Sequence, residues 1–354
     1  MRYTSFLLVL FISLHSFGQD DTTKTLKLST YVDMYYSYDF SNPKNFEKPD
    51  FNYNYKKHNQ LNVNLAFVKL GYQSSRVRSN LALMTGNYAM YNLSAEPNWA
   101  KPLLEANIGY KISKQQNIWV DAGVMPSHIG FESAVGADCW NLTRSILAEN
   151  SPYYETGIKL SYSNKKENLY LAFHLLNGWQ KIAVPNWDGK PSVGMQLTYK
   201  PSSTLTLNYS NFIGRIQLDS INPIRVFHNL YAIYEASPKT AFIFGFDIGT
   251  QNNAQGKGAI WYTPVMIAKL NLNSKSKIAG RLEYYNDKQQ LIIPTATING
   301  YQTFGASVNY DRQITSNVLW RAELKQYKSR DRIYRYEQAS ASQTSATMAL
   351  IVKF

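Results

Sequence analysis

Histidine and cysteine are the residues of this chain best suited to chemistry, and their spacing argues against a metal site or a disulfide. The histidines His58, His128, His174 and His228 are scattered, without the short paired spacing that metal sites use. The single cysteine, Cys139, can form neither an intrachain disulfide nor a zinc site. We therefore expect no metal and no cofactor.

One stretch comes close to a hydrolase motif. The residues from His174 to Gly178 have the outline of a motif in which a serine two positions after a histidine is the nucleophile. A serine nucleophile needs an adjacent base for its activation, and here Leu176 stands in its place. We therefore expect no catalytic residues and no enzyme activity.

Charged and polar residues that alternate with apolar ones form a second group of candidates. Lys69, Lys159, Gln196 and Lys269 each stand three residues before a bulky residue that closes an apolar run. Other charged residues alternate with apolar neighbours in the same way, and they are Asp121, Arg281, Glu283, Arg321 and Glu323. The three lysines would stand at the same depth in the barrel wall, with no acidic residue at that depth. If they line a water-filled passage, they attract anions. We expect these residues to be pore-lining, with a mild preference for anions.

The elements that must position these residues are strands. In eight runs every second residue is apolar, and each run ends on a bulky residue before a short polar turn or the chain end. The runs are Val68-Leu70-Tyr72, Ala106-Ile108-Tyr110, Ile158-Leu160-Tyr162, Met195-Leu197-Tyr199, Leu230-Ala232-Tyr234, Ala268-Leu270-Leu272, Ala306-Val308-Tyr310 and Leu350-Val352-Phe354. This is the period of a strand with one face in an apolar medium and the other in water. The pattern weakens where the apolar face switches between Asn62 and Val68, and where Pro264 interrupts a ladder.

Partner strands follow the short turns, which gives about sixteen strands in all. An opening strand from Leu26 to Tyr36 has no partner before it, so we expect it to pair with the last strand and close the sheet. The connections on the other side are longer, and they run roughly over 39–60, 89–103, 126–152, 178–191, 213–226, 250–259, 286–301 and 328–341. Alternating short and long connections are typical of the periplasmic turns and external loops of an outer-membrane barrel.

The predicted fold class is therefore all-β: a transmembrane antiparallel up-and-down β-barrel of about 16 strands. A soluble β-sandwich or propeller also has many short strands, but it leaves the aromatic rim and the loop lengths unexplained. Hydrocarbon offers no partner for backbone N–H and C=O groups, so a spanning sheet has to close on itself.

The width of such a barrel predicts its function. Barrels of about sixteen strands are too wide for wall side chains to fill and leave an aqueous channel. We expect a porin through which small hydrophilic solutes pass by passive diffusion. Two alternatives stay open, namely a plugged or narrow barrel with an adhesive or structural role, and an outer-membrane hydrolase.

The third long connection, about Pro126 to Pro152, mixes charged with apolar residues. In general porins the third external loop folds into the barrel, and by this analogy we interpret the connection as a constriction loop. Its candidate residues are His128, Glu132, Asp138, Arg144 and Glu149. The alternative is a loop that lies outside, over the rim.

The N-terminal residues predict where the protein is located, and the distribution of charge limits the kinds of partner that it can bind. The apolar stretch from Phe6 to Leu14 and the small residue Gly18 predict a secretory signal peptide over 1–18, which leaves 19–354 as one barrel domain. The chain has 37 basic and 24 acidic residues, a net charge of +13. Because the lysines are spread over strands and turns without a cluster, we expect no nucleic-acid partner.

Three short motifs resemble a known family. They are Trp119-Val120-Asp121-Ala122-Gly123, His128-Ile129-Gly130-Phe131-Glu132 and Ser151-Pro152-Tyr153-Tyr154-Glu155-Thr156-Gly157, and the strand end from Leu176 to Trp179 fits as well. On these motifs the chain resembles the OmpL-like outer-membrane β-barrel porin family of Bacteroidota-type Gram-negative bacteria. The resemblance implies an outer-membrane location and pore activity, and it names no solute.

The C-terminal residue, Phe354, closes the last alternating run. This ending resembles the signal that the barrel-assembly machinery reads, so we expect Phe354 to serve as the assembly signal. The expected partners are this machinery, outer-membrane lipid and small hydrophilic solutes, anions among them. A homo-oligomer stays open.

Overall fold

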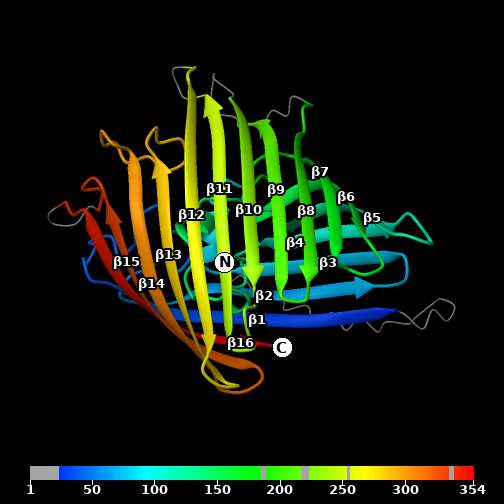
Figure 1. The fold of residues 1–354 in the computed structure, drawn as a ribbon, viewed down its shortest axis with the longest axis horizontal. Helices are drawn as coiled ribbons and strands as arrows, with labels where there is room; N and C mark the ends of the chain where they lie inside the picture. The colour runs from blue at the N-terminus through cyan, green and yellow to red at the C-terminus, as the bar shows by residue number, and fades with distance from the viewer. Residues whose placement is uncertain (1–23, 185–188, 217–222, 253–255, 335–338) are drawn as a thin grey trace, which may run out of the picture.

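The described part of the chain folds into one closed barrel (Figure 1). The computed structural model describes residues 24–184, 189–216, 223–252, 256–334 and 339–354, so the predicted signal peptide lies outside the described residues. Within these residues sixteen strands form an antiparallel ring. β1 (Thr25–Asp39) pairs with β16 (Ser342–Lys353) and closes it. The all-β class, the strand number and the closure by the first and last strands are confirmed.

The other strands follow around the ring in sequence order. The first part of the wall consists of β2 (Leu61–Gln73), β3 (Val77–Thr85), β4 (Leu103–Lys111), β5 (Asn117–Pro126), β6 (Tyr154–Ser163), β7 (Leu169–Leu176) and β8 (Ser192–Ser202). The second part consists of β9 (Leu205–Arg215), β10 (Ile224–Tyr234), β11 (Thr240–Asn252), β12 (Gly258–Asn271), β13 (Ser276–Asp287), β14 (Tyr301–Gln313) and β15 (Val318–Ser329).

Short helices lie in the connections. They are α1 (Asn87–Asn92), the 3-10 helix η1 (Gly136–Asp138) and α2 (Ile146–Glu149). In the described part of the chain, no helix is long and apolar enough to cross a membrane.

Large apolar side chains cover the outer face of the wall. In β2, Val68 and Leu70 expose 54% and 43% of their surface, whereas Lys69 between them points inward and meets Glu105. Exposing such a face to water costs roughly 25 cal/mol for each Å² of apolar surface, so the stable surroundings for this wall are hydrocarbon. The alternation in the sequence therefore reports which face touches lipid.

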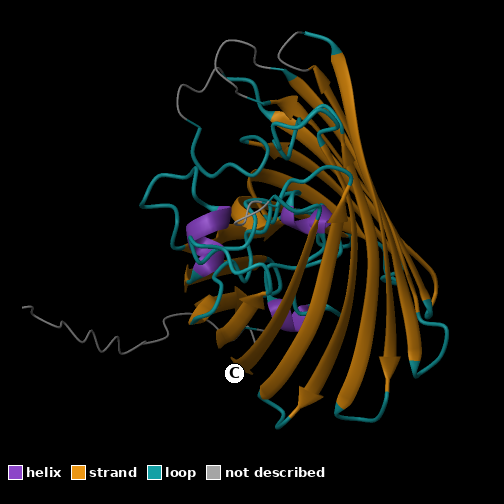
Figure 2. Ribbon diagram, turned by 90° about the vertical axis from the view of Figure 1, so that its left-hand side faces the viewer, coloured by secondary structure: helices purple, strands orange, loops and turns teal. Residues whose placement is uncertain are grey.

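Connections of different length lie at the two ends of the barrel (Figure 2). The strand order places short turns such as 74–76 and 203–204 at the end that carries the C-terminus, whereas long connections such as 40–60 and 127–153 start and finish at the other end. This alternation matches the prediction. The connection expected at 250–259 is shorter than predicted, because the ladder between β11 and β12 continues to its last residues.

Both irregular places in the strand pattern have a structural cause. Between β1 and β2 the register shifts, which leaves Asn64 as an extra residue, and Asn64 and Leu65 are both fully buried. This bulge accounts for the switch of the apolar face. Pro264 has a ladder partner in β11 but none in β13, because proline has no N–H to donate.

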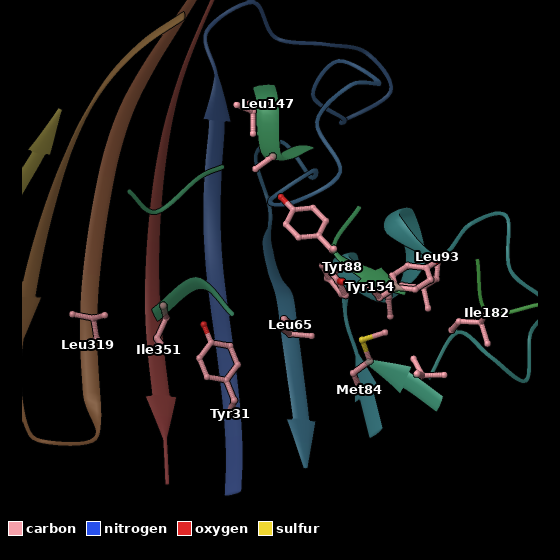
Figure 3. Packing of buried hydrophobic residues seen from close by; sticks show 14 of the residues in the cluster. Tyr31, Leu65, Met84, Tyr88, Leu93, Leu147, Tyr154, Ile182, Leu319 and Ile351 are labelled. Atoms are coloured by element: carbon pink, nitrogen blue, oxygen red, sulfur yellow. The ribbon is translucent and has the colours of Figure 1, made fainter. Parts of the chain in front are cut away.

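A hydrophobic cluster lies on the inner side of the wall (Figure 3). Tyr31 and Ile351 belong to β1 and β16, and Tyr88 and Leu147 belong to α1 and α2. All four side chains are at most 2% exposed. As expected for a barrel of this width, the wall side chains do not fill its interior. Parts of the long connections fold inward and occupy the middle.

Substitution of Gly123 should destabilise the barrel more than substitution of Gly280, a strand glycine with open space around it. Gly123 in β5 has a φ of +124°, and a Cβ there would lie 2.1 Å from the carbonyl oxygen of Ala106. We expect Gly123→Ala to lower the free energy of unfolding by about 1–3 kcal/mol, measured by thermal unfolding in detergent. Gly280→Ala is the control, because its nearest atom would be 3.9 Å away. Equal melting of both variants would contradict this explanation.

Candidate functional site

The loop 127–153, which joins β5 to β6, lies inside the barrel and crosses to the opposite wall. Its helix α2 contacts β12 and β13. The main-chain N–H of Ile146 donates to Glu283, and that of Thr143 donates to Glu323. The Lys325 ammonium donates to the carbonyl oxygen of Arg144 over 2.7 Å. The predicted constriction loop therefore folds into the lumen and does not lie over the rim.

Two buried wall arginines bind the main chain of this loop. Arg321 donates to the carbonyl oxygens of Gly136 and Cys139 over 2.6 and 3.0 Å, and to the Asp311 carboxylate over 2.7 Å. Arg281 donates to the carbonyl oxygen of Thr143 over 2.7 Å. A carbonyl oxygen only accepts hydrogen bonds, and a guanidinium only donates them. Each arginine therefore holds the main chain of the loop at the carbonyl groups that it contacts.

These wall charges form a buried network. The Arg281 guanidinium lies 3.1 Å from Glu323, 3.3 Å from Glu283 and 3.5 Å from Glu132 of the loop. Arg281 and Arg321 are 1% and 0% exposed. The expectation that they face water is therefore wrong, since the loop covers them. A buried charge is tolerated only when it is paired, and the loop completes the pairing.

The loop is also held together by its own charged residues. Arg144 is fully buried and donates to the carbonyl oxygens of Ser133, Ala134 and Leu142. Glu132 accepts from the main-chain N–H and the hydroxyl of Ser145. Asp138, in contrast, is exposed. Most of the charge predicted for a constriction loop thus serves to fix its shape.

Glu149 connects the loop to a second connection inside the barrel, the loop 40–60. Its carboxylate accepts from the main-chain N–H groups of Tyr53 and Asn54 over 2.8 and 3.2 Å. Burial raises the pKa of Glu149 above its ordinary value, although these donors favour the charged form. The loop 40–60 is in turn anchored to the wall, because the Tyr55 hydroxyl donates to Asp33 over 2.6 Å.

Two cavities lie on the two sides of this loop assembly. We call the cavity toward the long connections the external cavity. It has a volume of about 500 Å³, and its lining includes Tyr53, Trp179, Lys181, Lys190, Arg215 and Arg225. We call the cavity toward the short turns the periplasmic cavity. It has a volume of about 630 Å³, and its lining includes Lys27, Lys69, Glu105, Glu132, Asp138 and Lys353. Tyr154 borders both cavities, and its hydroxyl donates to Glu96 over 3.0 Å. Residues 149–154 therefore lie between the two spaces.

The wall residues predicted at one level have close partners. The Lys69 ammonium lies 2.6 Å from Glu105, and that of Lys159 lies 3.7 Å from Asp121. Gln196 donates to Asn208 over 3.1 Å, and Lys269 lies 4.2 Å from the ring centre of Trp140. The idea of three lysines without an acid is thus wrong.

The positions of the two acids explain this outcome. Asp121 stands directly opposite Lys159 in the ladder between β5 and β6. Lys69 and Glu105 flank Ala82 of β3 on either side, and the small Ala82 lets them meet above it. The first pair follows from the register of two neighbouring strands, whereas the second requires the register of three.

Sequence reasoning missed a cluster of His128, Glu155 and His174. The Nδ1 atom of His128 lies 2.6 Å from one Glu155 oxygen, and that of His174 lies 2.7 Å from the other. The two rings stack with centroids 4.1 Å apart. Burial disfavours the charged His128 ring, but the Glu155 carboxylate outweighs this effect and raises the pKa of His128. The available signal was that His128 and Glu155 lie in the family motifs and His174 begins the hydrolase-like stretch.

Loss of the Arg321 guanidinium should release the loop. We expect Arg321→Gln to expose Arg144, because three hydrogen bonds to loop carbonyl oxygens disappear. The measurement is limited trypsin digestion of the folded barrel, with cleavage after Arg144 identified from the fragment masses. Arg312→Gln is the matched control, since Arg312 in the same wall is exposed. Cleavage at equal rates in both variants and the unchanged chain would contradict this role.

Comparison with known proteins places this architecture among porins. The sequence model of the family described as "Putative beta-barrel porin-2, OmpL-like" matches residues 25–354. No curated protein matches the chain by sequence.

Solved structures give the same result for the fold. The anion-selective porin from Comamonas acidovorans superposes with a TM-score of 0.63 at 11% identity, over 94% of this chain and 100% of that one. The outer-membrane channel DcaP of Acinetobacter baumannii gives 0.61 at 8% identity, over 95% and 99%. The trimer form of OmpT from Vibrio cholerae gives 0.61 at 6% identity, over 94% and 100%.

Proposed function

Since the chain belongs to the OmpL-like β-barrel porin family of the outer membrane, we propose that it passes small hydrophilic solutes by passive diffusion past the loop 127–153. Membership of this family makes the chain a channel protein and not an enzyme. The solute class and the selectivity are the parts that we propose. The observation that carries the proposal is the pair of cavities, each lined in part by charged side chains, on the two sides of the loop assembly.

The proposed route runs from the external cavity past Tyr154 into the periplasmic cavity. Tyr154 borders both spaces, and residues 149–154 contribute to the lining of one or the other. Side chains that line a route of this size admit small solutes and hold back large ones. In this account the loop 127–153 acts as the constriction.

The external cavity supports a mild preference for anions. Among its described lining residues, Lys181, Lys190, Arg215 and Arg225 are basic and Glu149 is acidic. An excess of one sign of charge in a narrow entrance raises the local concentration of ions of the opposite sign. The porin from Comamonas acidovorans that shares this fold is anion-selective, and we extend that property to this chain as part of the proposal.

Two further partners complete the proposal. Insertion by the barrel-assembly machinery would use Phe354, whose side chain is 73% exposed and whose N–H and C=O groups bond to Thr30 of β1. OmpT of Vibrio cholerae, a structure with the same fold, occurs as a trimer. We propose a homo-oligomer for this chain as well.

A plugged barrel with a structural role is the second candidate. The observation in its favour is the burial of Arg144, Arg281 and Arg321 in the middle of the barrel. The two candidates differ in one measurable property, because a plugged barrel carries no current. Absence of single-channel steps for the intact chain, together with large steps after loop deletion, would select the plug.

Shortening the constriction should widen the passage. We expect deletion of about residues 134–146 to raise the single-channel conductance in planar bilayers several-fold, because conductance grows with the open cross-section. The deletion removes loop contacts of both Arg281 and Arg321, so folding must be verified by circular dichroism first. A folded deletion variant with unchanged conductance would count against the constriction.

Selectivity can be measured independently of conductance. In a tenfold gradient of KCl we expect a reversal potential of the sign that indicates chloride preference, and a smaller value for Lys181→Gln combined with Arg215→Gln. Lys165→Gln, in the turn between β6 and β7 at the opposite end of the barrel, is the control. A potential that indicates potassium preference would refute the anion proposal.

A further inference from the structure

The cluster of His128, Glu155 and His174 has an arrangement that pore function does not require. One potential ligand atom from each residue lies within 4.8 Å of the other two. The three residues are 6%, 2% and 1% exposed. They come from separate places in the chain: His128 from the start of the loop 127–153, Glu155 from β6 and His174 from β7.

Hydrogen bonding leaves part of this buried cluster unsatisfied. The Nε2 atom of His174 has no hydrogen-bond partner, and its Nδ1 atom contacts one Glu155 oxygen at 2.7 Å. Apart from this contact, that Glu155 oxygen has no hydrogen-bond partner. A buried polar group without a partner costs roughly 1–3 kcal/mol. A cation bound between Nδ1 of His174 and the Glu155 carboxylate would satisfy both atoms, as a shared proton does without it.

His128 is held in the orientation that leaves Nδ1 toward the cluster. Its Nε2 atom lies 2.8 Å from the carbonyl oxygen of Asn211, which only accepts, so Nε2 carries a proton. Histidine ligands of metal ions are commonly fixed in this way, through a hydrogen bond from the second nitrogen. The wall also makes room for the ring, because a Cβ at Gly194 would lie 2.6 Å from Nε2.

We propose that His128, Glu155 and His174 bind one divalent transition-metal ion inside the barrel. Two imidazoles and one carboxylate suit ions such as Zn²⁺ and Ni²⁺, whereas Ca²⁺ and Mg²⁺ prefer oxygen ligands alone. The inference goes beyond solute diffusion and does not depend on it.

Binding of one ion requires the three ligands to move. Donors bound to one zinc ion at about 2.0–2.2 Å lie roughly 3–4 Å apart, so the His–Glu contacts would lengthen by about 1 Å. The ring planes differ by 22°, and the His174 ring would tilt toward the ion. The Nε2 atom of that ring makes no hydrogen bond that would oppose the tilt. The negative charge of Glu155 compensates part of the charge of the ion.

The experiment uses the full mature chain without a histidine tag, refolded in detergent. Titration with ZnCl₂ at pH 7.5 in a calorimeter should give one bound Zn²⁺ per chain. Co²⁺ should give the visible absorption bands of a tetrahedral site. We expect His174→Ala and Glu155→Gln each to weaken Zn²⁺ binding by at least about tenfold, since each removes one of three ligands.

His228→Ala is the matched control, because His228 is a wall histidine of β10 that bonds to Tyr209 and lies outside the cluster. Its Zn²⁺ affinity should equal that of the unchanged chain. Folding of every variant is verified by circular dichroism, and Glu155→Gln keeps the side-chain volume in case His174→Ala fails to fold. The proposal is overturned if the unchanged chain binds Zn²⁺ no more tightly than His128→Ala/His174→Ala, or if His228→Ala loses binding equally.

Discussion

The buried guanidinium groups of Arg281 and Arg321 impose the constraint on which the inside of this barrel depends. A charge on the inner wall needs water or fixed partners, and both arginines are shielded from water. Their partners are acids of the wall and carbonyl oxygens of the loop 127–153. The loop is therefore part of the wall's charge pairing, and these contacts hold it inside the barrel.

This constraint links the fold to transport. The apolar outer face contacts lipid, and the closed ring pairs the backbone N–H and C=O groups that hydrocarbon cannot pair. The inner charges then fix the loop, and cavities with charged side chains in their lining lie on its two sides and share Tyr154. The proposed constriction is this internal segment, which Arg144 and Glu132 also bind to itself.

The wall was predictable from sequence, whereas the interior was predictable only in part. Period-two runs gave strand positions, and alternating connection lengths gave the two ends. Contacts inside the barrel join residues that are distant in the chain, such as Arg321 and the carbonyl oxygen of Gly136. Every residue has a main-chain carbonyl group, so the sequence does not indicate which one an arginine will contact. The pair Lys69 and Glu105 needs the register of three strands around Ala82. The site of His128, Glu155 and His174 likewise exists only after folding.

The single cysteine offers the most direct measurement of whether the loop is packed inside the barrel. Cys139 lies in the middle of the loop, is 3% exposed, and its carbonyl oxygen accepts from Arg321. Labelling of the folded chain in detergent with a polyethylene-glycol maleimide should give no mass shift, and labelling after unfolding should be complete. Rapid modification of Cys139 in the folded barrel would mean that the loop is outside, and the account would be contradicted.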